Sequence, residues 1–461
     1  MLVAALRQRI LELAIQGKLV PQSTDDGNAD ELYQQIQQER KKLIAAGELK
    51  KEKPLPPITK EEIPFDIPES WKWVKLGALC TICTGKKDAN FGSPNGDYLF
   101  FTCAKEPLRC NSYSFEGESI LLAGNGDIGN ISFYNGKFEA YQRTYVLQSP
   151  TSLYLLYLFY HIKYNWVKYN RGKVFGSAIP YIRLGNLENY LVALPPLGEQ
   201  KRIVAKVGAL FAELDAIEHS QERVAAIQTE LNKRILERAI QGKLVPQRPE
   251  EGTAEELYQQ IQKEKKKLIA AGKLKKEKPL PPISEDEIPF DIPESWKWVH
   301  LDSIAQTALG KTLDKVKNTG EYHPYLCSIN VYWSGIDLSK VKEARFEVDE
   351  LPKYGLKKGD LLICEGGDAG RSAIWESDAE MYYQNALHRV RFYGGISPYF
   401  YKYLLEYYGA AGILKAHCKG QTIKHLVQKS LCSMWLPLPP LAEQRRIVEK
   451  IEKCWHSVPN K

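Results

Sequence analysis

The segment that comes nearest to a cofactor-binding motif runs from Ala305 to Thr312. Its sequence, Ala-Gln-Thr-Ala-Leu-Gly-Lys-Thr, fits a phosphate-binding loop except that Ala305 replaces the first glycine. Without that glycine the backbone cannot easily form the phosphate cradle. A related segment, Cys80 to Lys87, has the same defect and has no threonine after Lys86. We therefore expect no ATP site in this chain.

Other residues that could do chemistry are better explained as structure. Four cysteines have the right type for a zinc site, but the related segment has Ala305 and Ala308 in place of the first two. We favour ordinary buried cysteines. Asp127 and Asp368 each lie in Gly-Asp-x-Gly, which is more typical of a turn than of a catalytic carboxylate. The four cysteines are Cys80, Cys83, Cys103 and Cys110.

The sequence contains no His-Glu-x-x-His, no Gly-x-Ser-x-Gly elbow and no calcium loop. It also lacks the Asn/Asp-Pro-Pro-aromatic motif that amino-methyltransferases carry. We therefore expect a chain without catalytic residues, metal or cofactor of its own. A fused methyltransferase–nuclease is the alternative from the enzyme class, and tight binding of S-adenosylmethionine would favour it.

Nucleic-acid recognition is a better match to the polar residues. Reading base edges requires Arg, Lys, Asn, Gln, Ser or Thr on loops that reach a groove. Such residues cluster beside glycine turns at corresponding places in two parts of the chain, although surface charge is the better explanation for any single one. The Gly-Lys pairs at Lys86 and Lys311 fit either a DNA-backbone contact or a plain β-turn. The candidates are Lys86, Lys87, Arg171, Lys173, Ser177, Tyr181 and Arg183 in the first part and Lys311, Lys315, Lys317, Lys419, Gln421, Lys424 and His425 in the second.

Composition permits this interpretation without requiring it. The net charge of +7 over 461 residues is a weak basic bias. Lysine-rich stretches at 40–53 and 263–278 are either solvated helix faces or contacts with DNA phosphates or a partner subunit. Nine scattered cysteines fit a reducing cytoplasm, and no apolar run reaches the roughly 18 residues of a membrane span. Arg7, Arg9 and Glu12 make the first helix a poor signal peptide.

An internal repeat in the sequence explains why the candidate DNA-binding residues occur at corresponding places in two parts of the chain. Residues 17–73 have a close double at 242–298, with Trp71 and Trp296 separated by 225 positions (296 − 71). The end segment 438–448 doubles 194–204 at a larger offset of 244 (438 − 194). One full copy therefore lies in the middle, and a second copy is cut and placed at the two ends. The chain is predicted to be a circular two-fold repeat.

Each copy has the same predicted parts. Capping-box spacing at Asn28 and Thr253 starts a helix, and Gly47 and Gly272 end it. A Pro-Leu-Pro-Pro linker then leads into a variable domain with short β-type runs, such as 119–122 and 361–364. Each variable domain has one predicted helix, at 153–169 and 399–414.

The segment 199–240 predicts a long helix with apolar residues at three- and four-residue steps, which indicates a seam for a partner helix. The terminal segments supply that partner, and the repeat places the two termini near the middle of an antiparallel pair. The predicted interface residues are Ile203, Val207, Leu210, Leu214, Ile217, Val224, Ile227, Leu231, Ile235, Ile447, Ile451, Leu6, Ile10 and Leu13.

Three repeated signatures resemble those of the specificity subunit of type I restriction–modification systems. They are Leu-Pro-Pro-Leu-x-Glu-Gln-[Lys/Arg]-Arg-Ile-Val at 194–204 and 438–448, Gln-Gly-Lys-Leu-Val-Pro-Gln at 16–22 and 241–247, and Ile-Pro-Glu-Ser-Trp ending at Trp71 and Trp296. The resemblance covers essentially the whole chain. It implies a mixed α/β (α+β) fold with two target recognition domains, separated by a long antiparallel two-helix coiled coil.

The resemblance also implies the division of the chain. We expect conserved half-spacer helices at 1–20 and 442–461, helix-plus-linker segments at 21–70 and 246–295, recognition domains at 71–197 and 296–441, and a central conserved helix at 198–245.

In that family the two domains read the halves of a bipartite duplex DNA site, and the coiled coil sets their spacing and docks two modification subunits. S-adenosylmethionine, ATP and Mg belong to the partners, which include two restriction subunits. The resemblance therefore implies a non-catalytic, cytoplasmic DNA-recognition subunit. A subunit of a type IIB-like system and a protein-binding coiled-coil scaffold remain as alternatives.

Overall fold

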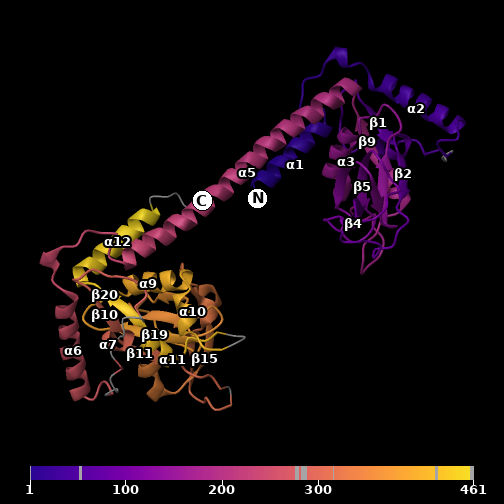
Figure 1. Ribbon diagram of the computed structural model, residues 1–461. Coiled ribbons are helices and arrows are strands. Elements are labelled where there is room, and N and C mark those ends of the chain that lie inside the picture. Colours follow the sequence, from indigo (N-terminus) through magenta and orange to yellow (C-terminus); the bar gives the residue numbers. More distant parts are fainter. Residues whose placement is uncertain are drawn as a thin grey trace. The chain divides into compact units, whose positions relative to one another are not determined.

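The computed structural model describes residues 2–50, 54–275, 280–281, 288–314, 316–420 and 424–456 (Figure 1). The chain divides into two units, Met1–Arg223 and Val224–Lys461, and each is described by itself. Within the described residues no helix is long and apolar enough to cross a membrane.

The first unit contains most of the long helix and a domain of two sheets. Its helices are α1 (Leu2–Ile15), α2 (Ala29–Ala45), α3 (Leu155–Tyr169), α4 (Leu184–Glu188) and the first part of α5 (Leu197–Ile240). Its strands are β1 (Lys72–Lys75), β2 (Thr81–Thr84), β3 (Tyr98–Phe101), β4 (Leu108–Cys110), β5 (Glu118–Ala123), β6 (Ile131–Asn135), β7 (Phe138–Ala140), β8 (Thr144–Gln148) and β9 (Leu191–Leu194).

The second unit repeats these elements and adds some. Its helices are the end of α5, then α6 (Ala254–Ala270), α7 (Leu301–Ile304), α8 (Leu351–Tyr354), α9 (Pro398–Ala410), α10 (Ile413–His417), α11 (Gln428–Cys432) and α12 (Leu441–His456). Its strands are β10 (Lys297–His300), β11 (Ala305–Leu309), β12 (Glu321–Leu326), β13 (Val331–Tyr332), β14 (Gly335–Ile336), β15 (Lys342–Phe346), β16 (Leu361–Cys364), β17 (Ser372–Ile374), β18 (Tyr382–Tyr383), β19 (Leu387–Phe392) and β20 (Trp435–Leu438).

The duplication predicted from the flanks extends through the diverged domains. The first unit has sheets of order β2-β8-β5-β6 and β4-β3-β7, and the second has β11-β19-β16-β17 and β15-β12-β18. Strand for strand these orders are equivalent, and in each smaller sheet the last pair is parallel. A separate antiparallel pair, β1 with β9 or β10 with β20, joins the two ends of each domain. The predicted mixed α/β fold with two similar domains is confirmed.

The extra length of the second domain is partly accounted for between β12 and β15. This segment carries the antiparallel hairpin β13–β14, while only residues 102–107 separate β3 from β4 in the first unit. The hairpin packs on β17, so the insertion adds a wall to one side of the second domain.

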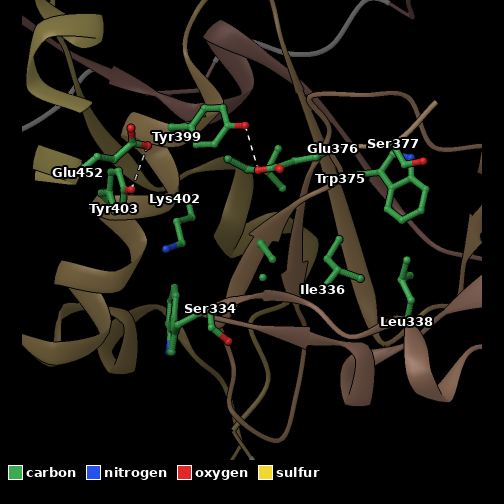
Figure 2. Close-up of a pocket in the computed structure, with 14 residues that line it drawn as sticks. Ser334, Ile336, Leu338, Trp375, Glu376, Ser377, Tyr399, Lys402, Tyr403 and Glu452 are labelled. Atoms are coloured by element: carbon green, nitrogen blue, oxygen red, sulfur yellow. Dashed lines mark hydrogen bonds between the residues drawn. The ribbon is translucent and has the colours of Figure 1, made fainter. Parts of the chain in front are cut away.

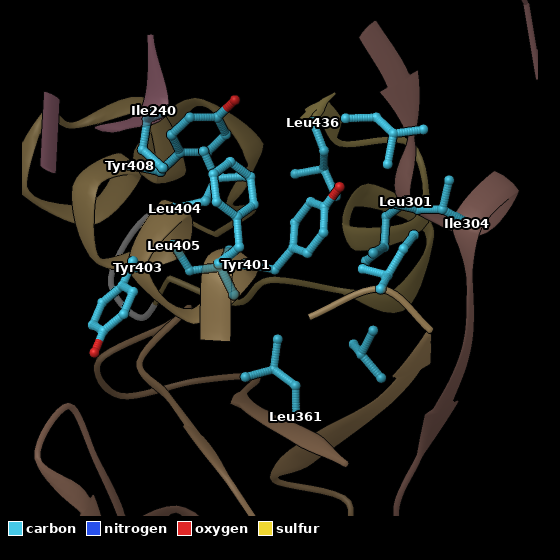
Figure 3. Packing of buried hydrophobic residues seen from close by; sticks show 14 of the residues in the cluster. Ile240, Leu301, Ile304, Leu361, Tyr401, Tyr403, Leu404, Leu405, Tyr408 and Leu436 are labelled. Atoms are coloured by element: carbon cyan, nitrogen blue, oxygen red, sulfur yellow. The ribbon is translucent and has the colours of Figure 1, made fainter. Parts of the chain in front are cut away.

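Each domain core is formed by its sheet and one aromatic helix. In the second unit, Leu361 of β16 and Tyr401 and Leu404 of α9 are buried with Leu301 and Ile304 of α7 (Figure 3). The hydroxyl of Tyr401 donates to the carbonyl of Pro437 at 3.2 Å. Tyr157 of α3 does the same to Ala193 at 2.6 Å in the first unit. Buried hydroxyls therefore keep a hydrogen-bond acceptor in both cores, as burial of a polar group requires.

The three repeated signatures meet at one place in each unit. The Glu199 carboxylate at the start of α5 accepts hydrogen bonds from Trp71 Nε1 at 2.8 Å and from Gln22 Nε2 at 2.6 Å. Gln200 Nε2 donates to the Pro195 carbonyl at 2.9 Å, and thereby helps to fix the first turn of the helix. The equivalent carboxylate of the second unit, Glu443, binds Trp296 and Gln247 at 2.9 and 2.5 Å.

The long helix has a partner on each of its two outer parts. Arg7 of α1 pairs with Asp215 and Glu218 of α5, while Gln22, just after α1, reaches Glu199 at the start of α5. The two helices of the first unit therefore run antiparallel (Figure 1). In the second unit, Ile235 and Ile240 of α5 share a buried cluster with Ile447 and Ile451 of α12.

The predicted seam is buried only where these partners lie. Six of its residues are buried, namely Ile203, Val207, Leu214, Ile235, Ile447 and Ile451. Leu210, Ile10 and Leu13 are half-buried. Five are exposed, namely Leu6, Ile217, Val224, Ile227 and Leu231. The exposed seam residues of α5 lie in the middle of the helix, between the parts that pack on α1 and on α12.

Two local predictions were wrong. The helix expected at 399–414 breaks after Ala410, because Gly412 adopts a left-handed conformation with φ of 78° and a second helix starts at Ile413. The capping box expected at Asn28 is absent: its side chain accepts from the Asp30 amide, whereas Thr253 forms the predicted box with Glu256. The helices expected at 153–169 and 199–240 form with boundaries shifted by two residues at their starts.

Candidate nucleic-acid interface

One end of the larger sheet gathers several loops in the first unit. β2 and β5 end at Thr84 and Ala123, and β8, which is antiparallel to both, begins between them at Thr144. Their loops are joined directly, since Gly85 N donates to Thr144 O at 3.2 Å and Gly124 N donates to Arg143 O at 2.8 Å. The residues that follow β2 and β5 and precede β8 therefore share one edge.

A longer loop, residues 170–183, is fixed to the same edge. Phe175 and Tyr181 exchange two backbone hydrogen bonds of 2.9 and 2.8 Å, and Tyr181 also bridges to Asn125. Gly126 N donates to Pro180 O at 2.8 Å. We name residues 85–88, 124–130, 141–143 and 170–183 the first loop surface. It brings together all seven residues predicted in the first domain.

The cations of the first loop surface are supported by aromatic rings. Lys173 Nζ lies 3.7 Å from the centroid of the Tyr169 ring, and Arg183 Cζ lies 4.0 Å from that of Phe175. Lys87 Nζ lies 4.5 Å from the Phe91 ring. In the part of the chain that the structure describes, Lys86, Lys87, Arg171, Lys173 and Arg183 make no ion pair with a carboxylate. Their charge is therefore available to a phosphate backbone.

Three polar residues of this surface were missed by the sequence analysis. Asn125 lies on the loop after β5, and Gln142 and Arg143 are exposed between β7 and β8. Gln142 N donates to Lys87 O at 2.9 Å, which places this short connection beside the loop after β2. No local pattern in the sequence indicates this position, because it follows from the sheet order β2-β8-β5-β6.

The second unit builds the same edge from equivalent loops. Gly310 N donates to Leu387 O at 3.0 Å, and Glu365 N donates to Ala386 O at 2.9 Å. Lys419 and His425 exchange two backbone hydrogen bonds of 2.8 Å, and His425 bridges to Gly366. We name residues 310–320, 365–371, 384–386 and 418–426 the second loop surface, within the described residues.

The predicted residues of the second unit have different outcomes. Lys419, Lys424 and His425 are exposed on the second loop surface. Lys317 is also exposed and lies 3.7 Å from Asp314. Lys315 and Gln421 lie outside the described residues. None of these placements tests whether DNA is bound.

Lys311 does not have the exposed position that a DNA contact requires. Its side chain is 3% exposed and pairs with Glu350, beside the Phe346 ring. The preceding Gly310 is needed because a Cβ there would lie 2.4 Å from the Gln384 backbone. The same close approach occurs at Gly85, 1.9 Å from the Ala140 carbonyl oxygen. In both domains the glycine of the Gly-Lys pair is thus the point where another backbone segment passes very close. Lys311 is a buried structural residue.

The cofactor and metal candidates also acquire structural explanations. The segment from Ala305 to Leu309 is strand β11, and Lys311 is held by Glu350 instead of facing a phosphate. Asp127 Oδ1 accepts from the Gly129 amide at 3.2 Å, which makes Gly-Asp-x-Gly a turn. No group of three or more His, Cys, Asp or Glu side chains among the described residues could hold a metal.

A separate pocket of about 470 Å³ lies on the second domain (Figure 2). It is bordered by the inserted β13–β14 hairpin, by Trp375 to Ser377 and by helices α9 and α12. Tyr399 donates to Glu376 at 3.0 Å on its wall. The pocket contains residues from the end of β17 that is opposite to the second loop surface, so it is a feature distinct from that surface.

Comparison with known proteins identifies both domains. The family model described as "Type I restriction modification DNA specificity domain" matches residues 68–226 and 293–455. The specificity subunits of the type I restriction enzymes EcoAI and EcoEI, both from Escherichia coli, are 28% and 26% identical to this chain, and each match covers 98% of this chain and 88% of the relative.

Solved structures agree in fold. The HsdS subunit from Thermoanaerobacter tengcongensis aligns with a TM-score of 0.50 and 17% identity, over 86% of this chain and 91% of that one. A chain from a study of the assembly and conformational transition of the type I restriction–modification system aligns with a TM-score of 0.56 and 20% identity, over 86% and 92%. Two matched domains, a repeated sheet order and a long helix between them lead to one conclusion: this chain belongs to the family of type I restriction–modification specificity subunits.

Proposed function

We propose that this chain selects the DNA target of a type I restriction–modification complex by reading a bipartite site, one half with each loop surface. The observation that supports this most directly is the pair of loop surfaces, which have equivalent construction and different side chains. Equivalent backbone hydrogen bonds fix Tyr181 in the first and His425 in the second. Phe175 likewise corresponds to Lys419, and Asn125 to Gly366.

A shared backbone with different side chains suits two domains that both bind duplex DNA but recognise different base sequences. The common backbone presents loops of similar shape to a duplex, while side-chain differences change the donors and acceptors that face base edges. On the first loop surface, Arg171 and Lys173 would contact phosphates, and Arg183 would contact a phosphate or guanine. Asn125, Gln142 and Ser177 could pair with base edges. On the second, Lys419, Lys424 and His425 take these roles.

The helices would supply spacing and assembly. The flanks that join α5 to each domain are nearly identical and make the same Glu–Trp–Gln contacts in both units. Equivalent surfaces suit two copies of one partner, so we assign them to the docking of two modification subunits. Methyl transfer from S-adenosylmethionine then belongs to the modification subunits. The ATP-driven steps, which use Mg, belong to two restriction subunits.

The decisive experiment is a methylome. The chain is co-expressed with its modification subunit in a host without other methylation, and N6-methyladenine is mapped. We expect one bipartite motif with a fixed gap. Exchange of residues 296–441 for another such domain should change one half of the motif, and exchange of residues 71–197 should change the other half.

The same experiment separates the alternatives. No motif, or an unchanged motif after exchange of either domain, would overturn the proposal and favour a protein-binding scaffold. Tight binding of S-adenosylmethionine to the chain alone would favour a methyltransferase. Cleavage on both sides of the motif by the modification complex without a restriction subunit would indicate the type IIB-like alternative.

A further inference from the structure

The first loop surface has an apolar tip among its cations. Nine consecutive residues, 171–179, are exposed. Ile179 is the most exposed large apolar side chain of this loop, at 60%, followed by Val174 and Phe175 at 37% each. Ile179, Val174 and Phe175 thus give one loop three exposed apolar side chains amid its cations, and a grouped apolar surface of this kind marks an interaction site.

The backbone under Ile179 is firmly held. Gly176 has φ of 81°, and a Cβ at that position would lie 2.5 Å from the Ile179 carbonyl oxygen, so only glycine closes this turn without displacement. The Phe175 ring stacks on Tyr181 with centroids 5.6 Å apart and an interplanar angle of 30°. The Phe175–Tyr181 hydrogen bonds close the loop at its base. The loop therefore presents Ile179 as a fixed projection.

Charge indicates what this projection meets. Arg171, Lys173 and Arg183 are exposed on the same loop, and among the described residues none of them forms an ion pair with a carboxylate. A fixed apolar tip surrounded by exposed cations complements duplex DNA, where phosphates flank an apolar stack of bases.

The repeat indicates what kind of contact it makes. At the offset of 244 residues, Ile179 corresponds to Ile423, which lies outside the described residues. The intervening positions differ, with Ser177 and Ala178 replaced by Gln421 and Thr422. A side chain shared by two readers that are otherwise different suits a role that is independent of base identity.

We propose that Ile179 is an apolar wedge that enters the duplex and unstacks a base step beside the half-site read by the first loop surface. The inference rests on the proposed function and extends it from reading to deformation of the DNA. Apolar side chains such as isoleucine are inserted between base steps in this way by architectural DNA-binding proteins.

The test uses the modification complex assembled with this chain and duplexes carrying its mapped motif. 2-Aminopurine is placed in turn at purines of the first half-site other than the methylated adenine, because its fluorescence rises when it is unstacked. With the original chain we expect one position to brighten on binding. Ile179→Ser should abolish this rise and lower kcat/KM for methylation by roughly tenfold or more, equivalent to one apolar contact. Ile179→Leu should restore both.

Two controls keep the outcome interpretable. Ile63→Ala removes an isoleucine that is 40% exposed on the linker, and it should leave fluorescence and rate unchanged. The methylome of the Ile179→Ser complex should keep the same motif. Full fluorescence and rate in Ile179→Ser would overturn the wedge, as would a change in the bases of the motif, which would make Ile179 a base reader. Absence of any bipartite motif with the original chain would instead overturn the proposed function.

Discussion

Glu199 accepts a hydrogen bond from the indole Nε1 of Trp71 at 2.8 Å, and this contact joins the first turn of α5 to the start of the first domain. Both residues are buried, and Glu443 and Trp296 repeat the contact at 2.9 Å in the second unit. The most similar segments of the two copies are thus those that fix each domain to its helix. This has consequences for stability that can be measured.

Replacement of Trp71 by Phe should destabilise the first unit. The buried carboxylate would lose its indole donor, and such a loss costs about 1–3 kcal/mol of the free energy of unfolding. Hydrogen exchange of the full chain in increasing urea, read by mass spectrometry, would report the loss of stability as a loss of protection in peptides of residues 2–223. Trp296→Phe is the matched control and should act on the second unit. Equal loss of protection in both units from either variant would contradict a local role.

Glu199 should also make stability depend on pH. Burial raises the pKa of its carboxyl above the ordinary 4.5, although the Trp71 and Gln22 donors act in the opposite direction. With a raised folded-state pKa, the stabilising contribution is complete below pH 4.5 and is lost as the pH rises through the folded-state pKa.

The matched variant Glu199→Gln cannot ionise at this position. The free energy of unfolding of the original chain, measured relative to that of the variant, should therefore fall as the pH rises through this window and become constant above it. Denaturation of both proteins at a series of pH values measures the difference. A difference that rises with pH would show that the carboxylate is stabilised, and would contradict the raised pKa.

Lys311 and Arg183 were both predicted as DNA contacts, but their substitutions should have different effects: loss of Lys311 should impair folding stability, and loss of Arg183 should impair DNA binding. Lys311→Met leaves Glu350 without its buried partner and should lower the free energy of unfolding by about 2 kcal/mol. Arg183→Ala should leave stability nearly unchanged, since this exposed side chain lies against the Phe175 ring and forms no ion pair among the described residues. Thermal unfolding and DNA binding measured on both variants would reveal the contrast. Normal stability with weakened DNA binding in Lys311→Met would contradict the structural role.

Cations of the first loop surface should determine the salt dependence of DNA binding. Each phosphate contact contributes about 0.9 to the slope of log K against log salt concentration. Arg171→Ala and Lys173→Ala should each reduce the slope by about this amount and leave the motif unchanged. Binding to the mapped duplex at several salt concentrations measures it. Lys201→Ala, an exposed lysine on α5, is the control; an equal change there would mean that the charge acts without a defined contact.

Prediction from the sequence succeeded where a pattern is local or repeated. The helix at 199–240 and strand 361–364 follow from periodicity, and the duplication follows from the near-identical flanks. It failed where distant segments meet. Gly85 and Gly310 resembled parts of a phosphate-binding or DNA-contacting turn, but both exist because another backbone crosses within van der Waals distance.

The candidate site was predictable in part for the same reason. Residues on glycine-rich loops, such as Lys173 and Lys419, could be chosen by composition and matched between copies. Gln142 and Arg143 could not, because their place beside Lys87 depends on the order β2-β8-β5-β6, which no local pattern encodes. The burial of Lys311 likewise depends on Glu350, 39 residues away along the chain.

The exposed middle of α5 offers a test of the spacing function that we propose for this helix. Every residue from Ile217 to Ile227 is exposed, so four helix-forming residues inserted after Arg223 would disturb no buried contact of the described chain. Four residues lengthen a helix by about 6 Å and rotate it by about 40° beyond one full turn. One base pair of B-DNA corresponds to about 3.4 Å and about 36°. The insertion should therefore lengthen the gap of the bipartite motif by one or two base pairs and leave both halves unchanged.

A methylome of the insertion variant measures this directly. Substitution of Glu222 and Arg223 by alanine, without a change of length, is the control and should keep the original gap. In this proposal the inserted residues would move one recognition domain away from the other and rotate it about the helix axis. The gap in the duplex must then match both the added length and the added rotation. An extension of one or two base pairs matches both approximately. An unchanged gap with full activity would mean that α5 does not set the spacing, and that the separation of the half-sites is fixed by the partner subunits.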